Sequence, residues 1–470
     1  VPVLTMEEVQ LGQVPATFHP PTLGPQDHAV YIFSSGTTGG QQEKVIMLTH
    51  QNLASNIQAT NALLEVYEGA VCLTGVADNT HSFEHFLQLW ALHNGLQLHF
   101  TTIVGFMKGA AATIEPHYLI MIPRAANMIM NAIKAKFKEA GLLSLLEAAV
   151  KQSTRHFRAK QHGLGPRPLA TFLHYLASAL LYPRVRRGLK AQFGRRVKYM
   201  IGGSAPLAAQ TQEFFLAVGG ENYNIKQGYG LTETSPVICV NNRHHYRIDP
   251  GHFSFGSSGR VIPGVEVVAA NADLLQKNGT IVSDAEGEEG LLLVKGPNVF
   301  AGYYQNPQKT SEAFIDGWFN TQDRARIQTV NDNTGLGPYL YITGRSKDLI
   351  VFDNGQKLAP ASLETYYEAH LAGIVSRFVC VGDTKNYLTA IIIPLEGVKR
   401  DIEAGKITKE DVCQTIHQQI SDAPKRFGHA IRRVTLDLEK DISAFETISK
   451  KLKKGLYLQA RQQMIEQLYR

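Results

Sequence analysis

Residues 31–52 read YIFSSGTTGGQQEKVIMLTHQN, and this stretch predicts a strand that runs into a binding loop. A short apolar run ends in a segment rich in Ser, Thr and Gly, which reaches Lys44 and then a second apolar run. Glycines let backbone N–H groups converge on an anion, hydroxyl groups add donors, and a lysine adds a point charge. The stretch therefore predicts a phosphate-binding loop, with an ordinary polar turn as the alternative. A P-loop is excluded because Lys44 follows Glu43 and precedes Val45, with no metal-binding hydroxyl beside it.

The composition is that of a globular protein with more than one domain. The chain has 470 residues, 44% of them hydrophobic and 19% charged, so we expect two or three domains. A net charge of +6 and a pI near 8.9 favour anionic partners such as nucleotides, coenzymes or acidic membrane surfaces. The charge does not choose among these, and we expect no nucleic-acid partner.

The cysteines and the N-terminus indicate the compartment. The four cysteines lie far apart in the sequence and show no metal-ligand spacing, which fits buried thiols in a reducing compartment. No secretory signal opens the chain, and its first residue is Val, so we expect an N-terminus that was processed or cut from a longer protein. We therefore expect a cytoplasmic location.

One apolar run and one basic segment raise the question of membrane contact. Residues 169–182 (LATFLHYLASALLY) are too short for a membrane span and predict a buried or interfacial helix. They lie inside residues 134–198, which are dense in Lys and Arg. A solvated helical face is one explanation of this charge, and peripheral attachment to a membrane surface is the other.

Three patterns of apolar and polar residues follow one another along the chain. Short apolar runs alternate with helix-period segments over residues 30–240, which predicts an α/β sheet with helices on its faces. Short strands separated by turn residues over 251–343 predict a small antiparallel barrel or sandwich. The remainder predicts a compact α/β segment that ends in a helix over about 451–469.

Residues 228–237 (GYGLTETSPV) carry a second candidate binding motif. An aromatic residue between two glycines can lie flat against a base, and Tyr229 is such a residue. Thr232 and Glu233 then present a hydroxyl and a carboxylate within one turn. A carboxylate beside bound phosphates suits Mg²⁺, which takes one or two protein ligands and keeps most of its waters. Taken alone, Glu233 also fits a solvated surface acid.

Further motifs follow the same logic. Residues 201–207 (IGGSAPL) predict a strand-to-helix turn at the carboxyl edge of an open sheet, where ligands bind. In residues 318–327 (WFNTQDRARI), Asp323 is a candidate acceptor for ribose hydroxyls, and Arg345 can hold the same sugar or a phosphate. Glycines and charged residues cluster around Arg345, where the pattern of short strands gives way to the final α/β segment. This clustering suggests a hinge. Lysines in residues 446–459 (ETISKKLKKGLYLQ) predict a basic helix start or a solvated face.

Together and in this order, these motifs resemble those of the adenylate-forming acyl-CoA synthetases, specifically the long-chain fatty acid branch. The resemblance runs from about Pro25 to the last residue. SSGTTG through LTH is similar to the family's phosphate loop, GGSAP to its adenine segment, and Tyr229 to Glu233 to its YGxTE motif. GPNVFAGYYQNP (296–307) and GRSKDLIV (344–351) are also similar to sequence motifs of the family. Five motifs in the correct order make the resemblance specific.

The resemblance implies a fold and its division into domains. It implies an α/β adenylation core of a doubly wound sheet over 1–250 and a small β-barrel subdomain over 251–346. A small mobile α+β lid domain follows over 347–470. The family's first α/β portion, which precedes the phosphate loop, is missing.

The resemblance also implies roles for particular residues. Phosphate binding would fall to Ser35, Gly36, Thr37, Thr38, Gly39 and Lys44, and adenine binding to Gly203, Ser204, Ala205, Pro206, Gly228, Tyr229 and Gly230. Thr232 would contact phosphate, Glu233 would bind Mg²⁺, and Asp323 with Arg345 would hold ribose. Lys347 would be the hinge, Gly355 would lie in the loop that lines the pantetheine passage, and Lys451 would be the catalytic lysine.

The sequence departs from the family pattern at several of these motifs. The phosphate loop has two surplus residues, Gln41 and Gln42, and has Glu43 and Val45 where Pro and Gly are usual. Gln322 replaces the Gly of the usual TGD.

Two more departures concern the catalytic lysine and the acyl site. Ile448 replaces a Pro, so the assignment of Lys451 over Lys450 rests on spacing. Ala125 and Ala126 stand where relatives often have a bulky aromatic residue, which would widen the acyl tunnel.

The activity that the resemblance implies is the ATP- and Mg²⁺-dependent activation of a fatty acid and its transfer to coenzyme A. Two alternatives stay open. One is an acyl-AMP ligase that loads a carrier-protein thiol, and the other is a non-catalytic lipid- or nucleotide-binding relative. Chain length and oligomeric state do not follow from the sequence.

Overall fold

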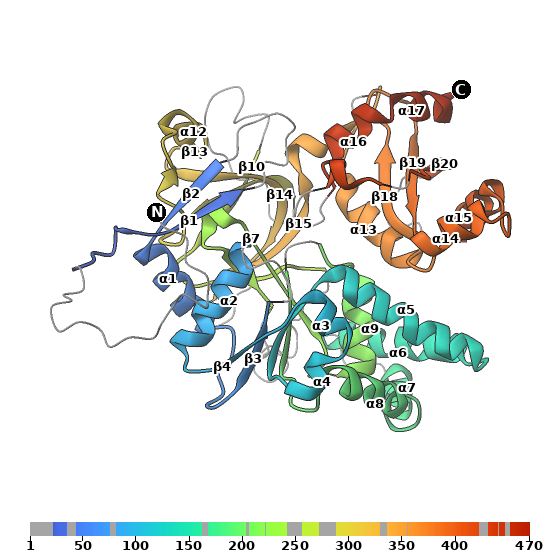
Figure 1. The fold of residues 1–470 in the computed structure, drawn as a ribbon, viewed down its shortest axis with the longest axis horizontal. Helices are drawn as coiled ribbons and strands as arrows, with labels where there is room; N and C mark the ends of the chain where they lie inside the picture. Colours follow the sequence, from blue (N-terminus) through green and yellow to red (C-terminus); the bar gives the residue numbers. More distant parts are fainter. Residues whose placement is uncertain are drawn as a thin grey trace, which may run out of the picture.

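The structure is a computed structural model with two lobes, a large one and a small C-terminal one (Figure 1). It describes residues 22–34, 44–75, 81–161, 168–203, 206–220, 222–241, 256–271, 288–329, 336–354, 356–422, 431–439, 441–446 and 452–470.

A parallel sheet forms the centre of the large lobe. Its strand order is β4, β3, β5, β6, β7, and each neighbouring pair is parallel. The strands are β3 (Val71–Thr74), β4 (Gln97–Phe100), β5 (Tyr118–Met121), β6 (Tyr199–Gly202) and β7 (Ile225–Gly230). Strands buried on both faces are expected to be continuously apolar, and all four residues of β3, β5 and β6 are buried.

Helices cover both faces of this sheet. They are α1 (His50–Asn61), α2 (Ser82–His93), α3 (Ile103–Met107), α4 (Ala110–Ile114), α5 (Pro123–Glu139), α6 (Leu143–Gln161), α7 (Pro168–Leu180), α8 (Tyr182–Phe193) and α9 (Ala209–Gly219). In β5, Tyr118 and Ile120 join the core under α1 and α2, whereas Leu119 and Met121 join the core under α5, α8 and α9. Successive side chains of a strand point to opposite faces, so one strand serves both cores. The predicted doubly wound α/β fold is confirmed (Figure 1).

Antiparallel strands continue the same sheet beyond β7. They are β8 (Val237–Val240), β9 (Gly259–Val261), β10 (Glu266–Ala270), β11 (Glu289–Lys295), β13 (Phe314–Ile315), β14 (Trp318–Gln328) and β15 (Tyr339–Arg345). The antiparallel strands predicted over residues 251–343 are therefore present. Among the described strands the order runs from β10 to β4 as one path that does not close.

A separate three-stranded sheet carries the start of the phosphate-loop region. It consists of β1 (His28–Ser34), β2 (Lys44–Thr49) and β12 (Gly302–Tyr303), and all pairs are antiparallel. Tyr303 lies opposite Ile46 in the register, so two segments far apart in the sequence meet next to Lys44. The short helix α12 (Pro307–Glu312) follows β12.

The C-terminal lobe has a mixed sheet of three strands with helices on both faces. The elements are the hairpin β16 (Ile350–Val351) and β17 (Lys357–Leu358), strands β18 (Val375–Val381), β19 (Leu388–Pro394) and β20 (Ile431–Leu436), and helices α13 (Pro360–His370), α14 (Glu396–Glu403), α15 (Lys409–Asp422), α16 (Lys454–Ala460) and α17 (Gln462–Tyr469). In β18, Phe378 and Cys380 pack towards α13 and α15, and Val379 and Val381 towards α16 and α17.

The prediction of a single helix over about residues 451–469 is wrong, because two helices, α16 and α17, lie there. They meet at Arg461, whose ψ of 20° departs from helical geometry. The Arg461 guanidinium lies 2.8 Å from Asp437 at the end of β20. A buried ion pair thus lies at the break between the two helices.

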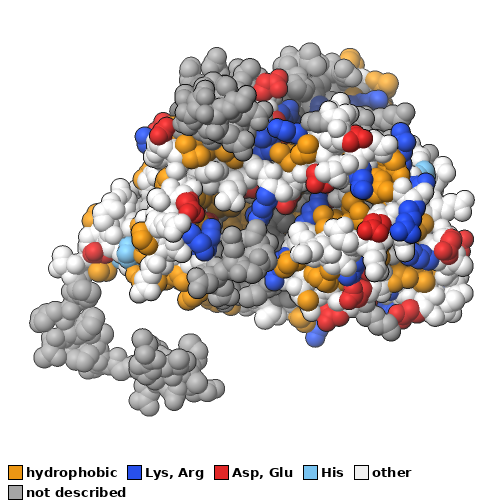
Figure 2. Space-filling model, turned by 90° about the horizontal axis from the view of Figure 1, so that it is seen from above, with side chains coloured by type: hydrophobic (Ala, Val, Ile, Leu, Met, Phe, Trp, Pro, Cys, Tyr) orange, Lys and Arg blue, Asp and Glu red, His pale blue; other side chains and the backbone are white. Residues whose placement is uncertain are grey.

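The lobes touch through α9 and α13. The side chain of Gln210 donates a hydrogen bond of 3.0 Å to the carbonyl of Tyr366. On the face seen in Figure 2, basic and acidic side chains are interspersed over both lobes. The four cysteines are free; Cys72, Cys239 and Cys380 are buried, as the sequence predicts, whereas Cys413 is partly exposed. Among the described residues, no helix is both long enough and apolar enough to cross a membrane.

Candidate active site

The structure describes about half of the predicted site residues. Lys44, Gly203, Pro206, Gly228 to Gly230, Thr232, Glu233, Asp323, Arg345 and Lys347 are described. Ser35 to Gly39, Ser204, Ala205, Gly355 and Lys451 lie outside the described residues, and their roles stay predictions.

Lys44 is predicted to bind phosphate and Glu233 to bind Mg²⁺. Both residues contact the side chain of Tyr303. The Lys44 ammonium lies 4.6 Å from the ring centroid of Tyr303, which is a cation–π distance. The Tyr303 hydroxyl donates a hydrogen bond of 3.0 Å to Oε1 of Glu233. Glu233 itself lies in a single 3₁₀ turn (Thr232–Thr234) that follows β7. The sheet of β1, β2 and β12 thus brings the lysine to the carboxylate.

The environment of Glu233 suits a cation. Burial raises the pKa of its carboxyl, and the hydrogen bond from Tyr303 and the charges of Lys44 and Arg345 oppose that rise. A half-buried carboxylate with one hydrogen-bonded oxygen is a fitting ligand for Mg²⁺, because this ion needs few protein ligands. Among the described residues no group of three or more His, Cys, Asp or Glu gathers as a metal cage. The donor set fits an ion that would be held mainly by phosphates and water.

Tyr229, Asp323 and Arg345 form a second group, on strands β7, β14 and β15 of the same sheet. The Tyr229 hydroxyl donates a hydrogen bond of 2.6 Å to Oδ2 of Asp323, and the Arg345 guanidinium lies 3.4 Å from Oδ1. Asp323 and Arg345 are directly opposite each other in the register of β14 and β15. Asp323 is only 5% exposed, so its orientation is fixed by these neighbours. The structure therefore brings together the three residues predicted to serve adenine and ribose.

The two glycines that flank Tyr229 differ in whether there is space for a side chain at their positions. A Cβ at Gly230 would lie 1.6 Å from the carbonyl oxygen of Pro236, which no side chain can do. A Cβ at Gly228 would lie 3.4 Å from the carbonyl of Cys239, an ordinary contact. Gly230 is thus required by the close approach of β8.

The turn after β6 places a glycine against an aromatic ring. A Cβ at Gly203 would lie 3.1 Å from the ring of Phe83, so little space is left between α2 and the turn. Thr232 reaches the same helix, because its hydroxyl donates a hydrogen bond of 3.0 Å to the Ser82 hydroxyl. The start of α2 therefore lies beside the end of β6 and the turn after β7.

Lys347 connects the site to the C-terminal lobe. It lies in a 3₁₀ turn (Ser346–Asp348) directly after β15 and two residues from Arg345. Partial burial lowers the pKa of its ammonium, and the charges of Arg345 and Lys44 lower it further, whereas Asp348 and Asp323 oppose them. Lys347 therefore interacts electrostatically with Lys44 in one group of the site and with Asp323 and Arg345 in the other.

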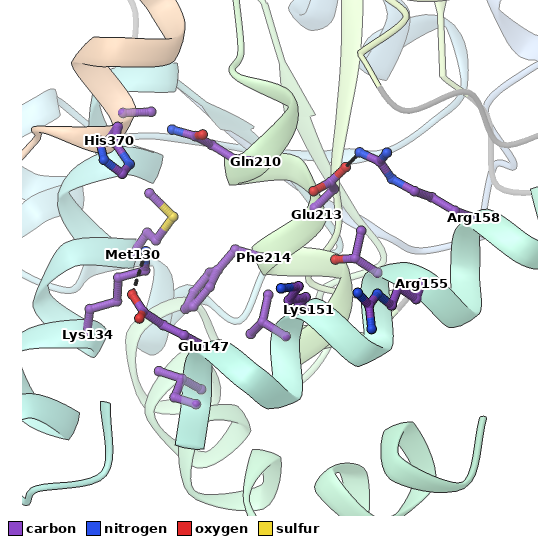
Figure 3. A pocket seen from close by; sticks show the side chains of 14 residues that line it. Met130, Lys134, Glu147, Lys151, Arg155, Arg158, Gln210, Glu213, Phe214 and His370 are labelled. Atoms are coloured by element: carbon purple, nitrogen blue, oxygen red, sulfur yellow. Dashed lines mark hydrogen bonds and ion pairs between the residues drawn. The ribbon is translucent and has the colours of Figure 1, made fainter. Parts of the chain in front are cut away.

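One cavity among the described residues lies apart from these groups. Its volume is about 410 Å³, and it opens where α13 meets α5, α6 and α9 (Figure 3). Two ion pairs cross its wall, Lys134 with Glu147 and Arg158 with Glu213. His370 comes from the C-terminal lobe, so the shape of the cavity depends on how the lobes are oriented.

Sequence reasoning missed three contributors to the site. Tyr303 lies in the GPNVFAGYYQNP segment, which was recognised as a motif but given no role. Ser82 and Phe83 lie at the start of α2 and carry no motif, so only the packing of α2 against the turns after β6 and β7 reveals them.

Comparison with known proteins agrees with this geometry. Residues 3–304 match the family described as AMP-binding enzyme, and residues 347–470 match the AMP-binding enzyme C-terminal domain. The long-chain-fatty-acid–CoA ligase FadD15 of Mycobacterium bovis is 30% identical over 370 residues, which are 78% of this chain and 54% of that protein. The long-chain-fatty-acid–CoA ligase ACSBG1 of Rattus norvegicus is 30% identical over 83% of this chain and 51% of its own length. The chain thus spans about half the length of these relatives.

A relative with another acceptor is also similar. The chloroplastic long-chain-fatty-acid–[acyl-carrier-protein] ligase AEE15 of Arabidopsis thaliana is 26% identical over 94% of this chain and 62% of its own length.

Solved structures share the fold at lower identity. ATP-bound MatB from Rhodopseudomonas palustris has a TM-score of 0.61 and 22% identity over 93% of this chain and 69% of its own. The adenylation domain of a carboxylate reductase from Mycobacterium chelonae has a TM-score of 0.67 and 19% identity, over 96% of this chain and 61% of its own. Taken with the arrangement of Lys44, Glu233, Tyr229, Asp323 and Arg345, these matches show that the chain belongs to the AMP-binding enzyme family, in the long-chain acyl-CoA synthetase branch of the adenylate-forming enzymes.

Proposed function

We propose that the protein activates a long-chain fatty acid with ATP and transfers the acyl group to coenzyme A. The observation that carries this proposal is the meeting of Lys44, Tyr303 and Glu233 beside the group of Tyr229, Asp323 and Arg345. One group suits phosphates and a divalent cation, and the other suits a nucleoside. The similarity to FadD15 and ACSBG1 supports a fatty acid as the acyl donor.

The chemistry follows from the low reactivity of a carboxylate. Its leaving group would be oxide, so that oxygen must first be bonded to AMP, which makes it part of a better leaving group. Attack of the carboxylate oxygen on the α-phosphorus of ATP breaks the bond to the β-phosphate and releases pyrophosphate, which leaves an acyl-adenylate. The thiolate of coenzyme A then attacks the acyl carbon, and AMP departs.

The side chains of the site have distinct tasks in this proposal. Lys44 and the residues Ser35 to Gly39 hold the leaving pyrophosphate, where a lysine and backbone N–H groups offset the developing charge. Glu233 holds Mg²⁺, which supplies further charge stabilisation on the phosphates when bound. Tyr229 and the turn from Gly203 to Pro206 flank adenine, and Thr232 contacts phosphate.

Asp323 and Arg345 fix the nucleoside. Asp323 accepts hydrogen bonds from both ribose hydroxyls, and the ion pair with Arg345 orients its carboxylate. Holding the sugar at a buried carboxylate positions the α-phosphate for in-line attack.

We propose that residues 347–470 move as a lid about Lys347 between the two half-reactions. In one orientation Lys451 reaches the α-phosphate, and in the other the loop at Gly355 lines the path of the thiol. Such closure excludes water from an intermediate that hydrolyses easily.

Replacing Lys451 tests the division of labour. Lys451→Ala is expected to reduce adenylation at least about 100-fold, because it removes a charge that stabilises the transition state. Thioester formation from supplied acyl-adenylate is expected to stay within about twofold. Lys450→Ala is the matched control and should affect neither half-reaction. Equal loss of both half-reactions in Lys451→Ala would overturn its role.

A carrier-protein thiol is the second candidate acceptor, because AEE15 matches 94% of the chain. Acyl transfer measured with coenzyme A and with a holo acyl carrier protein separates the two. A third candidate is a relative that binds nucleotide or lipid without catalysis, which the altered phosphate loop favours. It predicts ATP binding without exchange of pyrophosphate.

A further inference from the structure

The outward face of α7 is apolar along its whole length. Helix α7 has the sequence PLATFLHYLASAL, without Asp, Glu, Lys or Arg. Its large outward side chains are 42–68% exposed: Leu169, Phe172, Tyr175, Leu176 and Leu180. Their spacing places them on one stripe of a 3.6-residue helix. A solvent-facing helix normally carries charges on this side, so the stripe needs a partner.

The inward face of α7 fixes the direction of this stripe. Nδ1 of His174 lies 2.8 Å from the Ser153 hydroxyl, which lies 2.8 Å from the hydroxyl of Tyr182. Nδ1 of His156 lies 2.9 Å from the Thr171 hydroxyl, and the rings of His156 and His174 stack at 4.8 Å. These contacts tie α7 to α6 and α8 through polar groups, so the apolar stripe cannot simply turn inward.

The sequence on both sides of the stripe is basic and contains no acid. Between Glu147 and Glu213 the sequence has no Asp or Glu, while Lys and Arg recur throughout. Helix α8 follows α7 directly and packs against it. Arg184, Arg187 and Lys190 are exposed on α8. An apolar stripe on one helix and exposed cations on the helix packed against it complement a surface that offers acyl chains and negative head groups.

The dimensions decide how such a surface is engaged. A helix of 13 residues is about 20 Å long, whereas the hydrocarbon core of a bilayer is about 30 Å thick. Helix α7 therefore fits an orientation parallel to the interface, with its stripe at the boundary between head groups and acyl chains.

We propose that α7 and the exposed side of α8 dock the protein on an anionic lipid membrane. Phe172, Leu176 and their neighbours on the stripe enter the interface, and Arg184, Arg187 and Lys190 contact lipid phosphates. The proposal goes beyond the proposed function and does not depend on it, because it concerns binding and not turnover.

Co-sedimentation with vesicles tests the docking surface. Vesicles of phosphatidylcholine with about 30% phosphatidylglycerol are compared with pure phosphatidylcholine, at low and at high salt. The wild type is expected to bind the anionic vesicles at least about tenfold more tightly, since each basic side chain near such a surface adds about 1 kcal/mol, or about fivefold. High salt should remove most of this preference.

Two double variants separate the apolar part from the basic part. Phe172→Glu with Leu176→Glu is expected to lower binding at least about tenfold to both kinds of vesicle. Arg184→Glu with Arg187→Glu is expected to lower binding to anionic vesicles only. Leu92→Glu on α2, where Leu92 is 63% exposed, and Arg400→Glu on α14 are the matched controls and should bind like the wild type.

Several outcomes would overturn the proposal. They are no binding to either vesicle, equal binding to both, and binding that the variants leave unchanged. A dimer in sedimentation velocity without lipid, abolished by Phe172→Glu with Leu176→Glu, would assign the stripe to a second copy of the chain instead. Circular dichroism of each variant checks that the fold is retained.

Discussion

Glu233 is the residue at which the fold and the proposed chemistry make opposite demands. Burial raises the pKa of its carboxyl above the usual value of 4.5, even though Tyr303 and Lys44 favour the ionised form. The unfolded chain ionises this group at a lower pH than the folded chain does. Glu233 therefore makes the folded state more stable below pH 4.5 than at higher pH. This extra stability is lost as the pH rises through the raised pKa.

We expect Glu233→Gln to remove this dependence on pH and to remove activity. The amide still accepts the hydrogen bond from Tyr303 but carries no charge to desolvate. Relative to the wild type, the variant should be more stable at pH 7 than at pH 4, measured by urea unfolding at both values. Mg²⁺-dependent adenylation should fall about 100-fold or more. Glu312→Gln, an exposed acid on α12, is the control; a variant that keeps its activity would contradict the metal role.

Gln322 is a residue in a backbone conformation that favours glycine. Its φ is +60°, and its N–H is held by Asn320 Oδ1 at 2.9 Å. The left-handed region costs a residue with a side chain about 1–2 kcal/mol, and glycine returns part of this through its larger entropy in the unfolded chain.

Gln322→Gly is therefore expected to raise the unfolding free energy by about 0.5–1 kcal/mol, as measured by urea denaturation. Gln328→Gly in the same strand, where φ is not positive, should instead lower it by a similar amount. The assignment of strain would be wrong if both changes had the same sign. The sequence marks Gln322 as unusual for the family, but only the backbone angle explains why it matters.

At the scale of elements, β7 and β8 approach each other where Gly230 lies. The carbonyl of Pro236 occupies the space that a Cβ at position 230 would need, at a separation of 1.6 Å. At Gly228 the nearest atom would be 3.4 Å away. The two glycines flank the same tyrosine but meet different neighbours.

We expect Gly230→Ala to lower the unfolding free energy by more than about 4 kcal/mol, or to prevent soluble expression, because backbone must move. Gly228→Ala should stay within about 1 kcal/mol of the wild type. Soluble yield and urea unfolding of the pair give the answer. Equal tolerance of both alanines would contradict the close approach of β8.

The elements also show how far sequence reasoning reaches. The short apolar runs that predicted the α/β sheet over residues 30–240 are present as strands such as β5 and β6, because a strand buried on both faces is a short, continuous apolar run. The break at Arg461 was not predicted, and its ion pair with Asp437 joins residues that are far apart in the helical pattern of the sequence. Tyr303 was missed for the same reason, because its contact with Glu233 arises only when β12 pairs with β2.

At the scale of the whole molecule, the site joins segments from the entire chain. Lys44, Glu233, Asp323 and Arg345 come from four strands or turns between positions 44 and 345, and Lys347 leads from them into the second lobe. The order of the motifs predicted this assembly through a resemblance to a family. Composition and periodicity alone predicted the layers but not which turns would meet.

The most direct test of the central claim is ATP–pyrophosphate exchange that depends on a fatty acid. The protein is incubated with Mg²⁺, ATP, labelled pyrophosphate and fatty acids of increasing chain length, and label in ATP is measured. We expect exchange only when a fatty acid is present, with the highest rate for long chains, because exchange requires reversible formation of the acyl-adenylate. Binding of ATP with no fatty-acid-dependent exchange at any chain length would contradict the proposed function.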